Sequence, residues 1–509
     1  MAVSKGGAFG GIVKGNALNL QFTADFCILL PCILHCFSFC GILYSSNPER
    51  LLDYMGTLCF ILIAVIEIFF AVLTIKKYNE RKIWKKNRIF LRLVEIFIVL
   101  CIILLPITHL KWRFALAMIF LIIRLLVALI SLVATRKHKH HTPNPIKTPV
   151  AIISGGIIFM IFFAIFLAPA FIFTNYNGLK TTGDFQVKET SAILVDEKRT
   201  DDFETDGSFR EVPAHFFYPD TEKGNFPLVI FSHGAFGYYQ SNFSTYTELA
   251  SHGYVVISLD HPHHSFFTTD TQGNTIIVDN NFISTVMNIN KENVSKSEIF
   301  EVSHEWLKLR TDDENFVLNT LQKAKSNKEL DNTWYTEDKD TILNVLSKTD
   351  MEKIGLMGHS LGGATGVQVG RERKDIDAVI DLDGTMLGDI VDVKNGEYVY
   401  NKEPYPIPVL DFTKAQDVDN RKAFKEENGY VYVNQNVTDN AKTGKTVIFS
   451  NVEHMDFTDL PLISPTIASM FGKGNVDNEE FMTTINGIVL NWFDYYLKNE
   501  GTLNIQENY

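Results

Sequence analysis

The stretch KIGLMGHSLGGATGVQVG at residues 353–370 decides the fold of this chain. Its opening part, KIGLM, is an apolar run typical of a buried strand, and the small residues that close the stretch are suited to begin a helix. The tight turn between them consists of Gly358, His359, Ser360, Leu361, Gly362 and Gly363. In this G-x-S-x-G pattern a side chain at either flanking glycine would collide with its neighbours, and the strained turn exposes the central hydroxyl. The pattern therefore predicts Ser360 as a nucleophile.

Short apolar runs alternate with helical patterns on both sides of this turn. The runs are HFFYP (215–219), PLVIFSHG (227–234), YVVISLD (254–260), IDAVIDLD (376–383), IPVLDF (407–412) and KTVIFSN (445–451). The helical patterns cover 241–252, 298–325 and 479–498. This order predicts a mostly parallel β-sheet flanked by helices, and the turn identifies it as an α/β-hydrolase domain, placed at residues 206–509. The polar segment 265–297 is expected to form a lid or substrate loop.

A serine hydroxyl needs a base to take its proton and an acid to orient that base. In this fold class the chain order is serine, then an acid, then histidine. His454 is the sole histidine after Ser360, so we predict it as the base. Asp383 follows the next strand at the carboxyl edge of the sheet and is the preferred acid. Asp381 points the same way one step further in and is the alternative.

Two N–H donors are needed to stabilise the oxyanion that forms during attack on an ester. One is expected to be the amide of Leu361, directly after the nucleophile. The other should come from the loop SHGAFG at 232–237, with Ala235 preferred over Phe236. His233 is expected to brace this loop, and Phe236, Tyr238 and His263 are candidates for lining the substrate pocket.

The first third of the chain differs sharply from the rest. Five apolar stretches, at about 26–44, 55–75, 89–110, 114–134 and 150–174, are each long enough to span a bilayer as a helix. We therefore expect residues 1–174 to form a helical membrane anchor with about five transmembrane helices, joined through a linker at 175–205 to the catalytic domain. All six cysteines lie in the first 101 residues, where they suit small apolar positions in membrane helices.

Basic loops indicate the orientation of these spans. Seven Lys and Arg lie at 76–88 and four at 135–149, against one at 45–54 and two at 111–113. With the basic loops in the cytoplasm, the N-terminus is cytoplasmic and the catalytic domain is extracytoplasmic. Charged residues within the apolar stretches are costly unless paired. We expect Glu67 or Glu95 to pair with Arg124.

The charge balance excludes one class of partner. Residues 1–174 hold 18 Lys and Arg and 6 Asp and Glu, which leaves 29 basic and 53 acidic residues of the totals, 47 and 59, for the remainder. An acidic domain of this kind does not suit nucleic acid, because phosphate contacts need clustered basic side chains. The histidines at 138–141 and 261–264 raise the possibility of a metal site. We favour loop roles for both groups, since neither has the ligand pattern of a zinc site, and predict no metal and no cofactor.

With these residues placed, the chain resembles the plasma-type platelet-activating-factor acetylhydrolase family, a branch of α/β hydrolases that is lipoprotein-associated phospholipase A2-like. The resemblance rests on FSHGAFG (231–237), LASHGYVVISLDHPHHS (249–265), GHSLGGAT (358–365), LDGTM (382–386) and VEHMDFTDL (452–460). It implies Ser360, Asp383 and His454 as the catalytic triad, and Ala235 and Leu361 as the oxyanion donors. The chain departs from the family at Gly384 and Thr385 and at Pro262 and His263, which puts the substrate in question.

The resemblance implies a serine carboxylic-ester hydrolase of the 1-alkyl-2-acetylglycerophosphocholine esterase class. We accordingly expect a membrane-anchored esterase or lipase that cleaves short-acyl lipid or phospholipid esters through an acyl-enzyme, with the ester substrate and the lipid bilayer as its partners. Two alternatives stay open: an acyltransferase that uses the same triad, and a non-catalytic membrane sensor that retains the hydrolase fold. The oligomeric state does not follow from the sequence.

Overall fold

The computed structural model describes residues 55–76, 81–106, 108–134, 147–289, 291, 294–428 and 431–509. The chain divides into two compact units, residues 1–177 and 178–509.

The described part of the N-terminal unit is helical. Its elements are α3 (Met55–Lys76), α4 (Arg81–Leu104), the 3₁₀ turn η1 (Lys111–Phe114), α5 (Ala115–Ala134) and α6 (Lys147–Ile172). Three helices in the described ranges are long and apolar enough to cross a membrane, namely Met55–Ile75, Lys111–Val133 and Pro149–Ile172. They correspond to three of the expected spans, and the expected span at 26–44 lies outside the described residues. The remaining expected span, at 89–110, falls on α4, and this helix ends at Leu104. Five spans are therefore not confirmed.

Three buried charged side chains of this unit, Glu67, Arg92 and Glu95, are joined by ion pairs. The guanidinium of Arg92 on α4 lies 2.5 Å from the Glu95 carboxylate and also forms an ion pair with Glu67 on α3. Arg124 instead lies over the ring of Phe159, 5.0 Å from its centroid. The prediction that Glu67 or Glu95 pairs with Arg124 was therefore wrong. Arg92 lies three residues before Glu95 on the same helix and contacts both carboxylates.

A nine-stranded mixed sheet forms the centre of the C-terminal unit, in the order β13-β12-β9-β8-β3-β4-β2-β1-β7. Neighbours from β13 to β4 run parallel, whereas β2, β1 and β7 are added antiparallel. The strands are β1 (Val187–Thr200), β2 (Phe209–Pro219), β3 (Phe226–Ser232), β4 (Val255–Leu259), β7 (Trp334–Tyr335), β8 (Thr349–His359), β9 (Ala378–Leu382), β12 (Val409–Lys414) and β13 (Gly444–Phe449).

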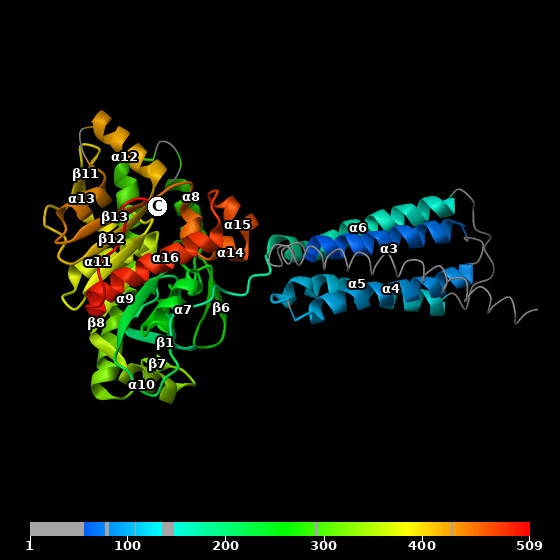
Figure 1. The fold of residues 1–509 in the computed structure, drawn as a ribbon, viewed down its shortest axis with the longest axis horizontal. Helices are drawn as coiled ribbons and strands as arrows, with labels where there is room; N and C mark the ends of the chain where they lie inside the picture. Colours follow the sequence, from blue (N-terminus) through cyan, green and yellow to red (C-terminus); the bar gives the residue numbers. More distant parts are fainter. Residues whose placement is uncertain are drawn as a thin grey trace, which may run out of the picture. The chain divides into compact units, whose positions relative to one another are not determined.

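Helices cover both faces of this sheet, which explains why its central strands are continuous apolar runs (Figure 1). Alternate residues of β3 enter different cores: Ile230 packs with α9, α10 and α11, and Phe231 packs with α7 and α16. The helices are α7 (Phe243–Ser251), α8 (Asn280–Ile289), α9 (Lys296–Asn327), α10 (Lys339–Ser347), α11 (Leu361–Glu372), α12 (Ala415–Asn428), α13 (Val433–Asn440), α14 (Leu460–Ile463), α15 (Pro465–Met470) and α16 (Asn478–Phe493).

Two segments contain more regular structure than expected. The linker range 175–205 includes β1, which pairs along its length with β2. The range 265–297 holds a short hairpin, β5 (Phe267–Thr269) with β6 (Thr275–Ile277), and then α8. A second hairpin, β10 (Ile390–Lys394) with β11 (Glu397–Tyr400), follows β9. The hairpin strands are short, so their apolar periodicity is too brief to stand out in the sequence.

A buried carboxyl on α9 predicts a pH-dependent stability. Glu314 is buried, and neither side-chain oxygen accepts a hydrogen bond within the described residues. Burial raises its pKa from 4.5 to about 8, opposed in part by Arg373. Across that interval the folded protein retains a proton that the unfolded chain has lost. The stabilising contribution is therefore complete below pH 4.5 and is lost as pH rises toward about 8.

We expect Glu314→Gln to flatten this dependence. Relative to wild type, the variant should gain about 1.4 kcal/mol of unfolding free energy for each pH unit within the interval. Urea denaturation at several pH values measures the difference. Parallel wild-type and variant curves would show that Glu314 ionises normally in the folded protein.

Candidate active site

Ser360 occupies a strained turn between β8 and α11. Its backbone has φ 55° and ψ −121°, a conformation that L-residues rarely adopt. The flanking glycines permit the turn, because a Cβ at Gly358 would lie 2.2 Å from the carbonyl carbon of Gly362, and one at Gly362 would lie 1.9 Å from the oxygen of Ser232. Each of these contacts is with backbone, so no side chain fits at either position. The turn places Ser360 at the carboxyl edge of the sheet.

His454 and Asp383 meet at the same edge. The Nδ1 atom of His454, at the start of η4 (His454–Phe457) after β13, lies 2.6 Å from Oδ2 of Asp383, which follows β9. Because a carboxylate only accepts, Nδ1 carries the donated proton and Nε2 is left to act as a base. The Asp383 side chain is 5% exposed and that of His454 is 36% exposed, so the acid is shielded while the imidazole stays accessible.

His359 supports the His454 imidazole. The two rings are 4.5 Å apart between centroids, and Nε2 of His359 is 3.1 Å from the carbonyl oxygen of His454. Burial, and then the neighbouring His454, lower the pKa of His359 well below its ordinary value. The neutral ring therefore donates from Nε2 to that carbonyl and holds the backbone of His454 against the turn.

Asp381 has different partners from Asp383. It is fully buried and accepts a hydrogen bond from the Gly384 amide at 3.0 Å, and a longer one from Asn434 at 3.4 Å. It thus lies beneath the turn that carries Asp383. Of the two aspartates, Asp383 is the one that contacts His454.

One cavity of about 740 Å³ contains Ser360, Leu361, Ala235, Asp383 and His454. The rest of its lining comes from α8, α9, the β10–β11 hairpin, the junction of β12 with α12 and the start of α13; it is more apolar than polar, and Lys296, Lys414 and Asp417 are its charged members. Examples of the apolar lining are Val286, Ile289, Ile299, Trp306, Tyr398 and Tyr400. A volume in this range suits a small organic ligand, and the apolar wall suits a hydrocarbon group.

Two backbone amides in this cavity are suited to bind an oxyanion. Leu361 is the first residue of α11, so its N–H has no acceptor within the helix. The loop after β3 passes close to Ser360, since a Cβ at Gly234 would be 3.2 Å from the serine Cβ. The amide of Phe236 donates to the carbonyl of His264 at 3.3 Å. This bond occupies the alternative donor and favours the Ala235 amide.

The expected pocket residues Phe236, Tyr238 and His263 do not line this cavity. Phe236 and His263 have positive φ values of 62° and 69°, and their rings pack against Phe282 and Phe203. Tyr238 packs against Phe267 in the β5–β6 hairpin. The sequence analysis placed them in the pocket because they are close to Ala235 in the chain, whereas the wall comes from distant segments. Two sequence patterns pointed toward that wall: the segment 265–297, expected as a lid or substrate loop, supplies Val286 and Ile289 from α8, and the amphipathic pattern at 298–325 includes Trp306.

The three histidines of the 261–264 segment each contact different residues. His261 lies between Asp313 and Ser232, at 3.0 and 2.8 Å. His263 stacks on Phe203, and His264 stacks on Phe282 with 3.8 Å between centroids. No group of three or more His, Cys, Asp or Glu suited to a metal ion occurs in the described part of the chain. The histidines at 138–141 lie outside it.

Comparison with known proteins identifies a family whose sequence model matches the unit that contains this site. The model of the family described as platelet-activating factor acetylhydrolase, isoform II, matches residues 209–507. Similar proteins include the platelet-activating factor acetylhydrolases of Cavia porcellus, 26% identical over 290 residues, and of Canis lupus familiaris, 23% identical over 290 residues. Each match covers 56% of this chain and 61% or 60% of the relative. The chain thus spans about 60% of the length of these relatives.

Among solved structures, a ferulic acid esterase from Streptomyces cinnamoneus aligns with a TM-score of 0.44 and 18% identity. The alignment covers 64% of this chain and 95% of the esterase. The family match extends over more than half of the present chain and includes the Ser360 turn, Asp383 and His454. The chain therefore belongs to the platelet-activating factor acetylhydrolase, isoform II, family.

Proposed function

We propose that this chain is a membrane-anchored serine esterase that cleaves short-acyl lipid or phospholipid esters through an acyl-enzyme. The observation that carries the proposal is the meeting of Ser360 and His454 in one cavity, with His454 held at Nδ1 by Asp383. The names of the family and of its relatives support the reaction class.

The first half of the reaction forms the acyl-enzyme. Ser360 Oγ attacks the ester carbonyl while Nε2 of His454 takes the hydroxyl proton. The imidazolium that results is stabilised by Asp383 at 2.6 Å. The amides of Ala235 and Leu361 stabilise the oxyanion, and each such donor contributes roughly 10²- to 10³-fold to the rate. His454 then returns the proton to the leaving alcohol.

Water completes the reaction by the same route. It attacks the acyl carbonyl as His454 removes its proton, and collapse of the second tetrahedral intermediate frees the acid and Ser360. The route needs no metal or organic cofactor, because the side chains and amides supply the nucleophile, the base and the charge stabilisation.

The membrane part is proposed as an anchor with a cytoplasmic N-terminus and an extracytoplasmic catalytic domain. The basic segments 76–88 and 135–149 lie on one side of the bilayer if α4 and α5 both cross it. The pairing of Arg92 with Glu67 and Glu95 supports a crossing by α4, since it offsets the charge of this helix inside the bundle.

Ester hydrolysis by the full-length protein in lipid nanodiscs tests the proposed activity. Over p-nitrophenyl esters from acetyl to palmitoyl, we expect kcat/KM to be highest for short acyl groups, because the family and its relatives are named acetylhydrolases. Free acid should be the product. Acyl groups recovered only on an added alcohol would indicate acyl transfer, and a folded protein inactive on every ester would refute the esterase.

A further inference from the structure

The orientation of one peptide group governs the proposed oxyanion hole. The N–H of Ala235 belongs to the peptide unit that also contains the carbonyl of Gly234. In a planar trans peptide these two groups point in opposite directions. Whatever holds the Gly234 carbonyl therefore sets the direction of the Ala235 N–H.

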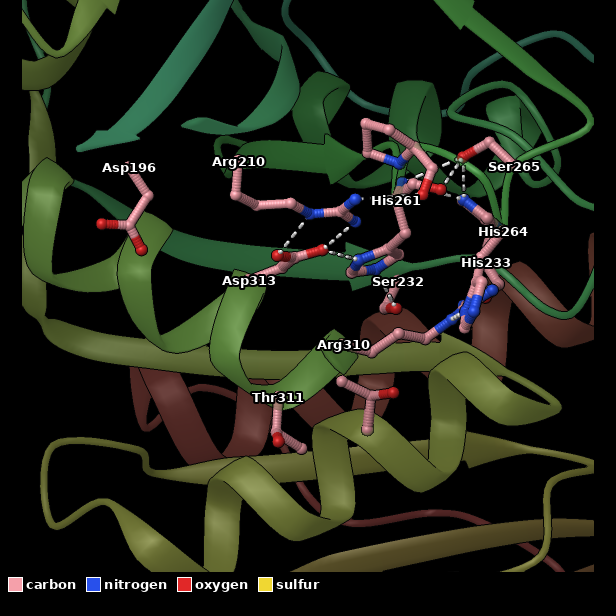
Figure 2. Close-up of polar contacts among 12 residues, drawn as sticks. Asp196, Arg210, Ser232, His233, His261, His264, Ser265, Arg310, Thr311 and Asp313 are labelled. Carbon is pink, nitrogen blue, oxygen red and sulfur yellow. Dashed lines mark hydrogen bonds and ion pairs between the residues drawn. The ribbon is translucent and has the colours of Figure 1, made fainter. Parts of the chain in front are cut away.

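Three donors converge on the Gly234 carbonyl. They are the His233 imidazole Nδ1 at 2.7 Å, the Gly237 amide at 3.1 Å and Nη2 of Arg310 at 3.3 Å. Nη1 of Arg310 also donates to the carbonyl of His233, the preceding residue in the loop. Arg310 thus clamps two successive carbonyls, and Figure 2 shows its side chain reaching from α9 toward His233.

The protonation of His233 suits this arrangement. Burial, and then the nearby Arg310, lower the pKa of His233 well below its ordinary value, so the ring is neutral. Because Nδ1 faces a carbonyl, it must carry the proton, and Nε2 is then an acceptor, which lies 2.8 Å from the hydroxyl of Ser265 and accepts from the amide of His261 at 3.4 Å. Both ring nitrogens are satisfied with Nδ1–H directed at Gly234.

Arg310 is an unusual residue to find here, because it is completely buried and burying a charge is costly without compensation. Burial lowers its pKa to about 9, with Asp313 opposing, so it remains charged at neutral pH. Within the described residues no carboxylate lies in ion-pair range of it. Asp313 bonds instead to Arg210 at 2.8 Å and to His261 at 3.0 Å. The hydrogen bonds of the buried guanidinium go mainly to the two loop carbonyls.

We propose that Arg310, assisted by His233, is a positioning residue for the oxyanion hole: it locks the 234–235 peptide so that the Ala235 N–H faces the cavity beside the Leu361 N–H. The inference rests on the proposed function. A lysine at this position presents a single ammonium and does not bridge both carbonyls in the geometry of the planar guanidinium.

Arg310→Lys tests the proposal in the full-length enzyme. We expect kcat to fall by about 100-fold or more, as on loss of one oxyanion donor, with KM nearly unchanged. Affinity for a trifluoromethyl ketone, whose adduct carries an oxyanion, should fall in proportion to kcat/KM. The matched control is Arg210→Lys, which alters the same buried cluster without contacting residues 233–235. It should lower Tm but keep kcat within about threefold, since the hydrogen bonds of Arg210 go to Asp201, Pro262 and Asp313 and to neither of the loop carbonyls that Arg310 holds.

A double-mutant cycle separates positioning from a general loss of structure. Ala235→Pro removes the N–H itself, so adding Arg310→Lys to it should cost no more than about threefold. Additive losses, or ketone affinity that stays high when kcat falls, would overturn the proposal. If Arg310→Lys does not fold, His233→Leu replaces it in the same cycle with the same expectation. An inactive wild type would instead refute the proposed function.

Discussion

Replacing Ser360 with alanine is expected to lower kcat for ester hydrolysis by about 10⁴-fold or more, because a triad without its nucleophile retains only binding and oxyanion stabilisation. The substitution removes one oxygen from a half-buried position at the N-terminus of α11. Tm should therefore change little. Steady-state assays on a short-acyl ester, with circular dichroism to confirm the fold, measure both effects.

Ser232 provides a matched control for this variant. Its hydroxyl lies 2.8 Å from Nε2 of His261, whose Nδ1 lies 3.0 Å from Asp313. These residues repeat the Ser–His–Asp connectivity, but all three are fully buried and no substrate reaches them. We expect Ser232→Ala to lower Tm while keeping kcat within about tenfold, since it leaves only a buried histidine nitrogen without its donor. Loss of activity in Ser232→Ala with retention in Ser360→Ala would reverse the assignment.

The second large effect is expected for Asp383→Asn, with a fall in kcat of about 10⁴-fold, the size measured when a triad aspartate becomes an amide. An asparagine amide facing Nδ1 of His454 favours the tautomer with its proton on Nε2, which cannot take a proton from Ser360. It also lacks the charge that stabilises the imidazolium. Kinetics on the purified variant measure the loss, and raising the pH should not restore the activity.

Asp381→Asn separates the two candidate acids. Asp381 accepts from the Gly384 amide and from Asn434, so its substitution should lower stability and leave kcat at least about 100-fold above that of Asp383→Asn, because no triad charge is lost. Equal losses in the two variants would contradict the assignment of Asp383.

Local patterns explain why much of this site could be predicted. The Ser360 turn requires glycine at 358 and 362 because the backbone is crowded there, and this requirement is visible as a motif of neighbouring residues. His454 follows from chain order, because it is the sole histidine after the serine. The central strands are buried on both faces and therefore appear as unbroken apolar runs.

Contacts between distant segments explain what could not be predicted. The wall of the cavity brings together Val286, Trp306 and Tyr398 of the β10–β11 hairpin. These residues belong to three separate segments, and no sequence pattern indicates that the three segments meet. The clamp by Arg310 likewise joins a helix to a loop about 76 residues earlier in the chain. Pairing of Glu67 with Arg92 depends on how α3 packs against α4, which hydropathy alone does not determine.

The central claim is that Ser360 becomes covalently acylated, and active-site labelling measures this most directly. Full-length wild type treated with a fluorophosphonate should lose its esterase activity and gain one adduct, found by mass spectrometry on the peptide that contains Ser360. Ser360→Ala should gain none. An adduct on another residue, or complete inactivation without modification of Ser360, would contradict the account.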